Sequence, residues 1–213
     1  MRRVISFGDS CTFGHGLPDC HDETGNGPGD YPSKYAWPAK IAEYLGHLNW
    51  INYAYPGASN KEILWTLMQN ERYLKQDDLI FIQWTYPHRK SILAADGSEP
   101  IRLFPQAKDE LSVKYYEQYE TEADSVWESQ IWISYADGLL STRDCTHLFF
   151  TRRDKRIFDI GEWTGNGKGV DKVMGDFKHI GSYALDGMHP GVDAHDQWAK
   201  YLISEIRKTQ TII

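Results

Sequence analysis

The sequence is poor in the features that mark several large classes of protein. It has only three cysteines among 213 residues, an odd number without metal-like spacing. Neither a disulfide framework nor a zinc site is therefore predicted, and the thiols are expected to be reduced. No apolar run approaches the roughly 20 residues of a membrane-spanning helix. The apolar segment after Met1 is too short for a secretory signal, which predicts a cytoplasmic protein unless another route exports it.

An excess of positive charge is also missing. The chain has 23 Lys and Arg against 30 Asp and Glu, a formal net charge of −7, which argues against a nucleic-acid partner or an anionic membrane surface. Its 41% hydrophobic and 25% charged residues are ordinary for a globular protein. No repeat or low-complexity linker interrupts it. We predict a single domain over residues 1–213, with inserts around 11–33, 87–112 and 151–180, and the oligomeric state stays open.

Strand-like and helix-like patterns alternate along the chain. Short apolar runs predict strands at 4–7, 50–53, 79–82 and 147–150. Helices are predicted at 37–46, from a capping box at 59–62 onward, and at 194–207. A further helix is predicted where Tyr119, Val126, Ile133 and Leu140 recur every seven residues. This order indicates an α/β protein with a parallel sheet between two layers of helices, in which ligands bind at the carboxyl ends of the strands.

Two short motifs at opposite ends of the chain carry the chemistry. Gly8-Asp9-Ser10 follows the first strand, and Asp186-Gly187-Met188-His189-Pro190 stands near the C-terminus. Taken singly, Ser10 is typical of a helix N-cap and Asp186 of a turn. Together, a serine, a histidine and an aspartate can supply the nucleophile, base and orienting carboxylate of acyl transfer. His195 is a second, weaker candidate for the base, because its position is typical of the start of the last helix.

In this order the motifs resemble the SGNH (GDSL-like) hydrolases, from residue 4 to about residue 205. The family's second block, a glycine after the second strand, corresponds to Gly57. The resemblance implies a flavodoxin-like three-layer α/β/α fold and the hydrolysis of esters, thioesters or related acyl compounds. It also implies that Ser10 is the nucleophile, His189 the base and Asp186 its partner. The backbone N–H groups of Ser10 and Gly57 would then form the oxyanion hole.

The third block departs from the family pattern. Where the family has Gly-x-Asn-Asp, this chain has Gln83-Trp84-Thr85-Tyr86, so the oxyanion-binding Asn is absent. Thr85 falls at the matching position, and its hydroxyl is predicted to be a third oxyanion donor. Arg89 and Trp84 are expected to bind substrate, although a solvated arginine is an equal alternative for Arg89.

The leading hypothesis is a serine hydrolase that cleaves carboxylic O-acyl esters through an acyl-serine, without cofactor or metal. Acetyl esters of glycans are the favoured example, because the 8 Trp and 13 Tyr suit a surface that stacks against sugar rings. Two alternatives stay open. One is a catalytically idle SGNH scaffold that acts as a binding or structural module, suggested by the missing Asn. The other is a thioesterase or lysophospholipase.

Overall fold

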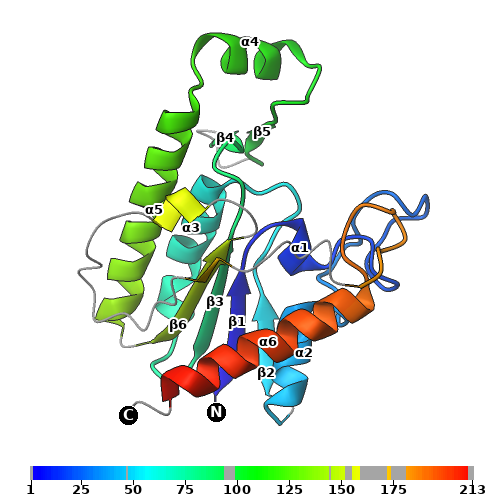
Figure 1. The fold of residues 1–213 in the computed structure, drawn as a ribbon, viewed down its shortest axis with the longest axis vertical. Helices are drawn as coiled ribbons and strands as arrows, with labels where there is room; N and C mark the ends of the chain where they lie inside the picture. The colour runs from blue at the N-terminus through cyan, green and yellow to red at the C-terminus, as the bar shows by residue number, and fades with distance from the viewer. Residues whose placement is uncertain are drawn as a thin grey trace.

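The computed structural model describes residues 2–46, 48–93, 99–143, 145–151, 155–158, 172–173 and 181–210. At its centre is a sheet with the strand order β2-β1-β3-β6-β7 (Figure 1). The strands are β1 Arg3–Phe7, β2 Asn49–Asn52, β3 Leu79–Trp84, β6 Thr146–Thr151 and β7 Lys172–Val173. Each neighbouring pair is parallel, which confirms the predicted parallel sheet. The predicted insert at 151–180 lies largely outside the described residues.

The central strand β3 is covered on both faces, and all six of its residues are buried. Side chains alternate along a strand, so the two faces of β3 enter two separate cores. Leu79 and Phe81 belong to one core, and Ile80, Ile82 and Trp84 belong to the other. This two-sided burial explains why the strand has a continuous apolar run instead of an alternating one.

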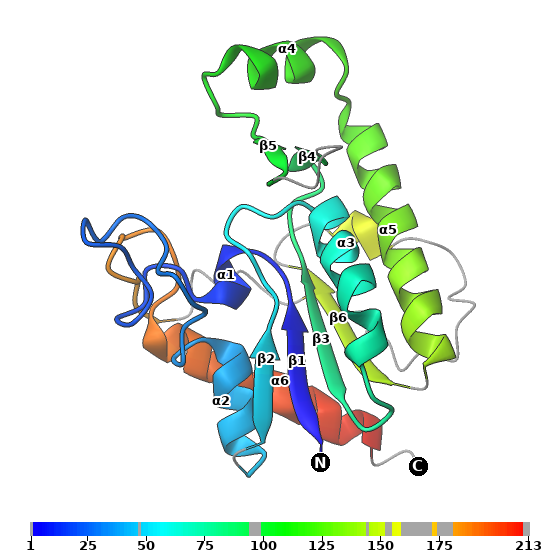
Figure 2. The same ribbon diagram turned by 180° about the vertical axis from the view of Figure 1, so that it is seen from behind.

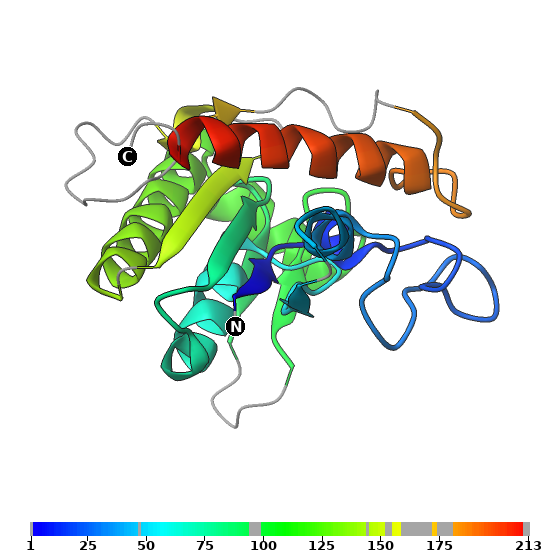
Figure 3. The same ribbon diagram turned by 90° about the horizontal axis from the view of Figure 1, so that it is seen from below.

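Helices form a layer on each face of the sheet (Figures 1 and 2). On one face lie α2 (Trp37–Tyr44) and α6 (Val192–Gln210), and on the other lie α3 (Asn60–Asn70) and α5 (Glu122–Thr142). The view from below shows α6 running along its face of the sheet (Figure 3). The architecture is therefore the expected three-layer α/β/α sandwich. None of the described helices combines the length and the apolar character needed to cross a membrane.

Local sequence signals explain where these helices begin and which face they bury. Pro38 occupies the first turn of α2, where its missing N–H costs no hydrogen bond. In α3, the Ser59 hydroxyl accepts from the Glu62 N–H and the Glu62 carboxylate accepts from the Ser59 N–H, which confirms the predicted capping box. The predicted apolar face of α6 is buried against the sheet, through Trp198, Ala199, Leu202 and Ile206.

The seven-residue repeat does not form one helix. A break separates α4 (Glu110–Gln118) from α5, so Tyr119 lies between them, while Ile133 and Leu140 are buried in α5 as predicted. The break occurs because Thr121 caps α5, its hydroxyl accepting from the Asp124 N–H at 3.2 Å. The insert before α4 contains an antiparallel hairpin of β4 (Lys90–Ile92) and β5 (Ile101–Leu103). The remaining short elements are α1 (Ser10–Phe13) and two 3₁₀ helices, η1 (Glu71–Tyr73) and η2 (Lys155–Phe158).

Candidate active site

Ser10 is placed by the sharp change from strand β1 to the single-turn helix α1. The N-cap of this helix is Asp9, whose Oδ1 accepts from the Cys11 N–H at 3.0 Å. Ser10 is thus the first residue of the helix and not its cap. Because the Asp9 side chain already accepts from an N–H group of the first turn of α1, the Ser10 hydroxyl is not needed as a cap and remains available for another partner.

A chain of hydrogen bonds joins Ser10, His189 and Asp186. The Ser10 Oγ lies 2.9 Å from His189 Nε2, and His189 Nδ1 lies 2.5 Å from Asp186 Oδ2. The second carboxylate oxygen of Asp186 accepts from the N–H groups of Met188 and His189, both at 2.9 Å. A proton on Nδ1 would be held by the carboxylate, leaving the Nε2 lone pair facing the serine hydroxyl. This arrangement can remove a proton from Ser10 as its oxygen attacks an electrophile.

The surroundings of His189 and Asp186 favour a neutral histidine beside an ionised aspartate. Burial lowers the pKa of His189 below its usual value, and the nearby Asp186 carboxylate only partly offsets this effect. Burial would raise the pKa of Asp186, but hydrogen bonds from His189 and from the Met188 N–H outweigh it, so this pKa is lowered. At neutral pH a neutral imidazole therefore faces Ser10, with an ionised carboxylate behind it.

Gly57 lies on the loop that follows β2, at the same sheet edge as Ser10. Its φ of +80° is a left-handed conformation that favours glycine. A Cβ at this position would lie 3.3 Å from the Arg102 side chain and 3.3 Å from the Phe104 ring. Backbone conformation and crowding therefore both favour glycine. In the described part of the chain, neither the Gly57 N–H nor the Ser10 N–H donates a hydrogen bond to another protein group.

No protein-family model matches the sequence, and no curated protein matches it. Solved structures do match the fold. A member of the lipolytic G-D-S-L family from Veillonella parvula aligns with a TM-score of 0.54 at 14% identity, over 96% of this chain and 97% of that one. A catalytic mutant of Axe2, an acetylxylan esterase from Geobacillus stearothermophilus, aligns with a TM-score of 0.54 at 13% identity, over 96% and 93%. A carbohydrate esterase with divergent catalytic and non-catalytic binding functions aligns with a TM-score of 0.63 at 14% identity, over 97% and 68%.

The chain has the SGNH hydrolase fold. Within this fold, Ser10, Gly57 and Thr85 follow the strands β1, β2 and β3, and the segment that carries Asp186 and His189 precedes α6. In the sheet these strands stand in the order β2-β1-β3, so the positions after β2 and β3 flank Ser10 at the carboxyl ends of the strands.

Thr85 is the position where the sequence departs from the SGNH pattern, and its hydroxyl is already engaged. It donates to Asp9 Oδ2 at 2.7 Å and accepts from Arg89 at 2.9 Å. Since a hydroxyl has a single proton, this proton is committed to the buried Asp9 carboxylate. The arrangement argues against the expected role of Thr85 as a third oxyanion donor.

Arg89 and Asn60 hold the region around Thr85 together. The guanidinium of Arg89 lies 2.8 Å from Asp9 Oδ2 and forms an ion pair with it, while 18% of the Arg89 side chain remains exposed. The Asn60 amide accepts from the Thr85 N–H at 2.7 Å and donates to the Thr85 carbonyl at 3.3 Å and to Ser129 Oγ at 3.0 Å. Arg89, expected to bind substrate, thus has a clear structural partner in Asp9, next to Ser10.

Two other candidate residues lie in the protein interior. Trp84 has no exposed surface and packs edge-on against Phe149, so the expectation that it contacts substrate is wrong. As the last residue of β3, it points into the same core as Ile80 and Ile82. His195 lies in the first turn of α6, as predicted; it is buried, and its Nδ1 accepts from the Trp37 N–H at 3.1 Å.

His15 is a site residue that the sequence motifs do not indicate. Its ring stacks on that of His189, with the ring centroids 4.4 Å apart and the planes inclined by 20°. His15, Asp186 and His189 bring one possible metal-ligand atom each within 4.8 Å of one another. The lone pairs of stacked imidazoles lie in nearly parallel planes and do not converge on a common point, so this geometry does not suit a metal ion.

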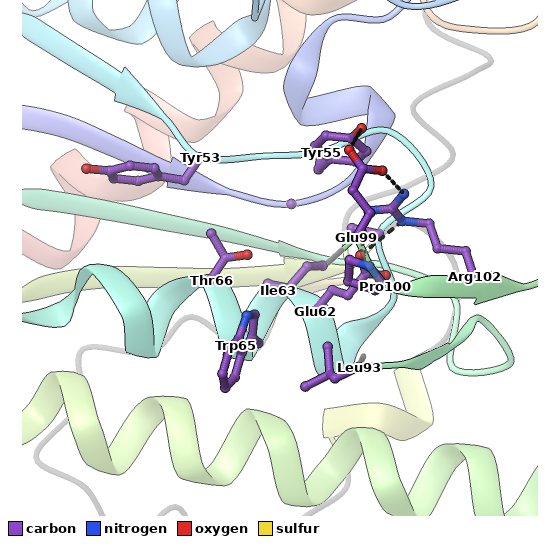
Figure 4. A pocket seen from close by; sticks show the side chains of 12 residues that line it. Tyr53, Tyr55, Glu62, Ile63, Trp65, Thr66, Leu93, Glu99, Pro100 and Arg102 are labelled. Atoms are coloured by element: carbon purple, nitrogen blue, oxygen red, sulfur yellow. Dashed lines mark hydrogen bonds and ion pairs between the residues drawn. The ribbon is translucent and has the colours of Figure 1, made fainter. Parts of the chain in front are cut away.

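A cavity of about 350 Å³ lies next to the Gly57 loop (Figure 4). Gly8 and Ala58 border it, which places it close to both Ser10 and Gly57 in the sequence. Arg102, held by Glu62 at 2.7 and 2.9 Å, stacks over the Tyr55 ring. The other lining residues are Tyr53, Ile63, Trp65, Thr66, Leu93, Glu99 and Pro100. The cavity thus combines aromatic rings with charged groups, and the sequence motifs do not reveal it.

Proposed function

We propose that the protein is a serine hydrolase that cleaves carboxylic esters through an acyl-serine intermediate. The observation that carries this proposal is the hydrogen-bonded chain from Ser10 Oγ through both nitrogens of His189 to Asp186. An idle scaffold would not require these three side chains to meet in this order. The esterases among the structural neighbours support the same class of reaction.

The reaction proceeds in two halves. Ser10 Oγ attacks the ester carbonyl while His189 Nε2 takes the hydroxyl proton, and the backbone N–H groups of Ser10 and Gly57 stabilise the oxyanion. The tetrahedral intermediate collapses as His189 returns the proton to the departing alkoxide, which leaves as the alcohol. Water, deprotonated by His189, then attacks the acyl-serine and releases the carboxylic acid. Asp186 stabilises the imidazolium in both halves.

Within this class we propose acetyl or other short acyl esters of glycans as substrates. The cavity beside the Gly57 loop supports this choice, because Tyr55 and Trp65 are 45% and 44% exposed and can stack against sugar rings. Charged Glu62, Glu99 and Arg102 line the same cavity. A long acyl chain would be unfavourable beside these charges, which makes a lysophospholipase or long-chain thioesterase the weaker alternative.

The nucleophile is tested by labelling with a fluorophosphonate and mapping the modified peptide. The adduct is expected on Ser10 and is expected to disappear in Ser10→Ala, while Ser134→Ala on the exposed face of α5 serves as the control. Labelling of a different serine, or labelling that survives Ser10→Ala, contradicts the assignment. Absence of both labelling and turnover favours the idle scaffold.

The substrate class is tested by comparing acetate release from acetylated xylo-oligosaccharides with the hydrolysis of p-nitrophenyl acetate and p-nitrophenyl octanoate. Trp65→Ala is expected to raise KM for the glycan ester and to leave p-nitrophenyl acetate hydrolysis unchanged. Trp127→Ala, which removes an exposed tryptophan of α5 outside the cavity, is the matched control. A preference for the octanoate ester, with no effect of Trp65→Ala, contradicts the glycan proposal.

A further inference from the structure

His15 lies on a turn that binds both halves of the candidate active site. The turn directly follows α1, and the Gly14 and His15 N–H groups both donate to the Ser10 carbonyl, at 2.9 and 3.1 Å. On its other side, the Leu185 N–H donates to the Gly16 carbonyl at 2.9 Å. The backbone of this turn therefore joins the nucleophile helix to the loop that carries Asp186 and His189.

The two glycines that flank His15 make this close approach possible. Gly14 and Gly16 have φ values of +88° and +80°, a region that side chains other than glycine rarely adopt. A Cβ on Gly16 would lie 3.0 Å from the Asp186 carboxyl carbon and 3.1 Å from Ala184. The turn is thus fitted against the Asp186 carboxylate, and His15 is the one residue of this Gly-His-Gly segment that has a side chain.

The His15 ring has its own anchor, independent of the catalytic residues. Its Nε2 lies 3.0 Å from the Asn26 carbonyl oxygen and can donate to it, which fixes the tilt of the ring. The face of the ring then lies against the face of His189, with the centroids 4.4 Å apart. The hydrogen bonds to Ser10 and Asp186 fix the positions of the two ring nitrogens of His189. They still permit the ring to rotate about the line that joins these nitrogens. A flat surface stacked on one face opposes that motion.

We propose that His15 is a positioning residue that holds the His189 ring in the orientation shared with Ser10 and Asp186. The inference rests on the proposed function, because it assigns His15 a role in the same serine–histidine–aspartate reaction. His15 does not touch the reacting atoms. It acts through the stack, by keeping Nε2 directed at the Ser10 hydroxyl and by shielding one face of the base from water.

The charges around His189 fix the direction of the expected pH effect. Asp186 faces it from its own loop, Asp9 from the cap of α1, and His15 from the following turn, while Arg89 is paired with Asp9. Burial and the neighbouring His15 both lower the pKa of His189, and the two carboxylates raise it. Removing the His15 ring exposes His189 to water and removes the neighbouring imidazole, and both changes raise the pKa of His189.

Three substitutions separate the stack from the other properties of His15. His15→Gln keeps an N–H donor for the Asn26 carbonyl but has no ring, and His15→Phe keeps the ring but has no donor and no charge. His15→Ala removes both. His21→Ala, an exposed histidine of the same loop outside the triad, is the matched control.

We expect His15→Gln and His15→Ala to lower kcat about three- to tenfold with little change in KM, as the loss of an aromatic pair implies. Their kcat–pH profiles are expected to shift toward higher pH on the acid side. His15→Phe is expected to stay within about twofold of the wild type, and His21→Ala to match it. A His15→Gln enzyme as active as the wild type, or a His15→Phe enzyme as slow as His15→Ala, overturns the proposal.

A measurement that needs no substrate keeps this inference separate from the proposed function. NMR titration of the His189 ring nitrogens reports its pKa directly, and thermal unfolding verifies that each variant is folded. We expect a raised His189 pKa in His15→Gln and a smaller change in His15→Phe. If Ser10 is never acylated but the His189 pKa responds in this way, the esterase proposal fails and the contact stands. If Ser10 is acylated and the His189 pKa is unchanged in His15→Gln, the His15 proposal fails alone.

Discussion

Replacing Arg89 with methionine removes the cationic partner of a carboxylate that has no solvent contact. Asp9 Oδ2 accepts from Arg89 at 2.8 Å and from Thr85 at 2.7 Å, and Asp9 Oδ1 accepts from the Cys11 N–H at 3.0 Å. Breaking a fully buried ion pair costs about 3–5 kcal/mol, because the remaining charge is left without compensation. Here the hydrogen bonds from Thr85 and the Cys11 N–H to Asp9 survive and Arg89 is 18% exposed, so we expect a loss of about 1.5–3 kcal/mol in the free energy of unfolding.

For a chain of this length, such a loss lowers Tm by roughly 3–12 °C, which differential scanning calorimetry measures, while a denaturant titration measures the free energy of unfolding. The control is Arg143→Met, since Arg143 pairs with Glu71 at 3.0 Å but the two side chains are 41% and 31% exposed. A pair of this kind contributes at most about 1 kcal/mol. If Arg89→Met changes the free energy of unfolding by no more than Arg143→Met does, Asp9 does not depend on Arg89, and the reasoning is refuted.

Further predictions concern the proposed catalytic residues and Thr85. His189→Ala is expected to lower kcat nearly as far as Ser10→Ala, while Asp186→Ala retains at least tenfold more activity, because an imidazole without its carboxylate can still act as a base. An Asp186→Ala enzyme as inactive as Ser10→Ala contradicts this ranking. Activity requires the neutral His189 ring, and burial lowers the pKa of this ring. The midpoint of the acid limb of the kcat/KM profile is therefore expected below pH 6.5. A midpoint above 6.5 argues against His189 as the base. Thr85→Val is expected to destabilise the fold by about 1–2 kcal/mol and to slow acylation less than about tenfold, because its hydroxyl serves Asp9. A loss of a hundredfold in a folded Thr85→Val protein would restore Thr85 as an oxyanion donor.

The features predicted correctly from the sequence are those set by neighbouring residues. The Ser59–Glu62 capping box, the apolar face of α6 and the buried strand β3 each follow from patterns within one turn or one strand. The pairing of Ser10 with His189 is what the resemblance to the SGNH hydrolases implies, since Ser10 follows β1 while His189 lies on the loop before α6. Their hydrogen bond, between residues 179 positions apart, agrees with that expectation.

The errors concern side chains whose partners are distant in the sequence. Thr85 binds Asp9, 76 positions earlier, and a buried carboxylate is a stronger acceptor than the oxygen atoms usually open to a loop threonine. His15 meets His189 only because two left-handed glycines turn the chain back on itself. Trp84 is different, because the two-residue period of β3 already places it on the same face as Ile80 and Ile82. Its burial could have been predicted by extending the strand two residues further.

The hydrogen bond between Leu185 and Gly16 has a consequence for how this chain acquires its structure. It closes, together with the bond between Ser10 and His189, a loop that contains most of the polypeptide. Closing a loop of this length is slow and entropically costly until the intervening sheet and helices have brought its ends together. Folding should therefore assemble the β1–β3 sheet before Ser10 and His189 meet. Recovery of fluorophosphonate reactivity during refolding would then trail the recovery of helical circular dichroism, and the chain would become chemically competent only in its last folding step.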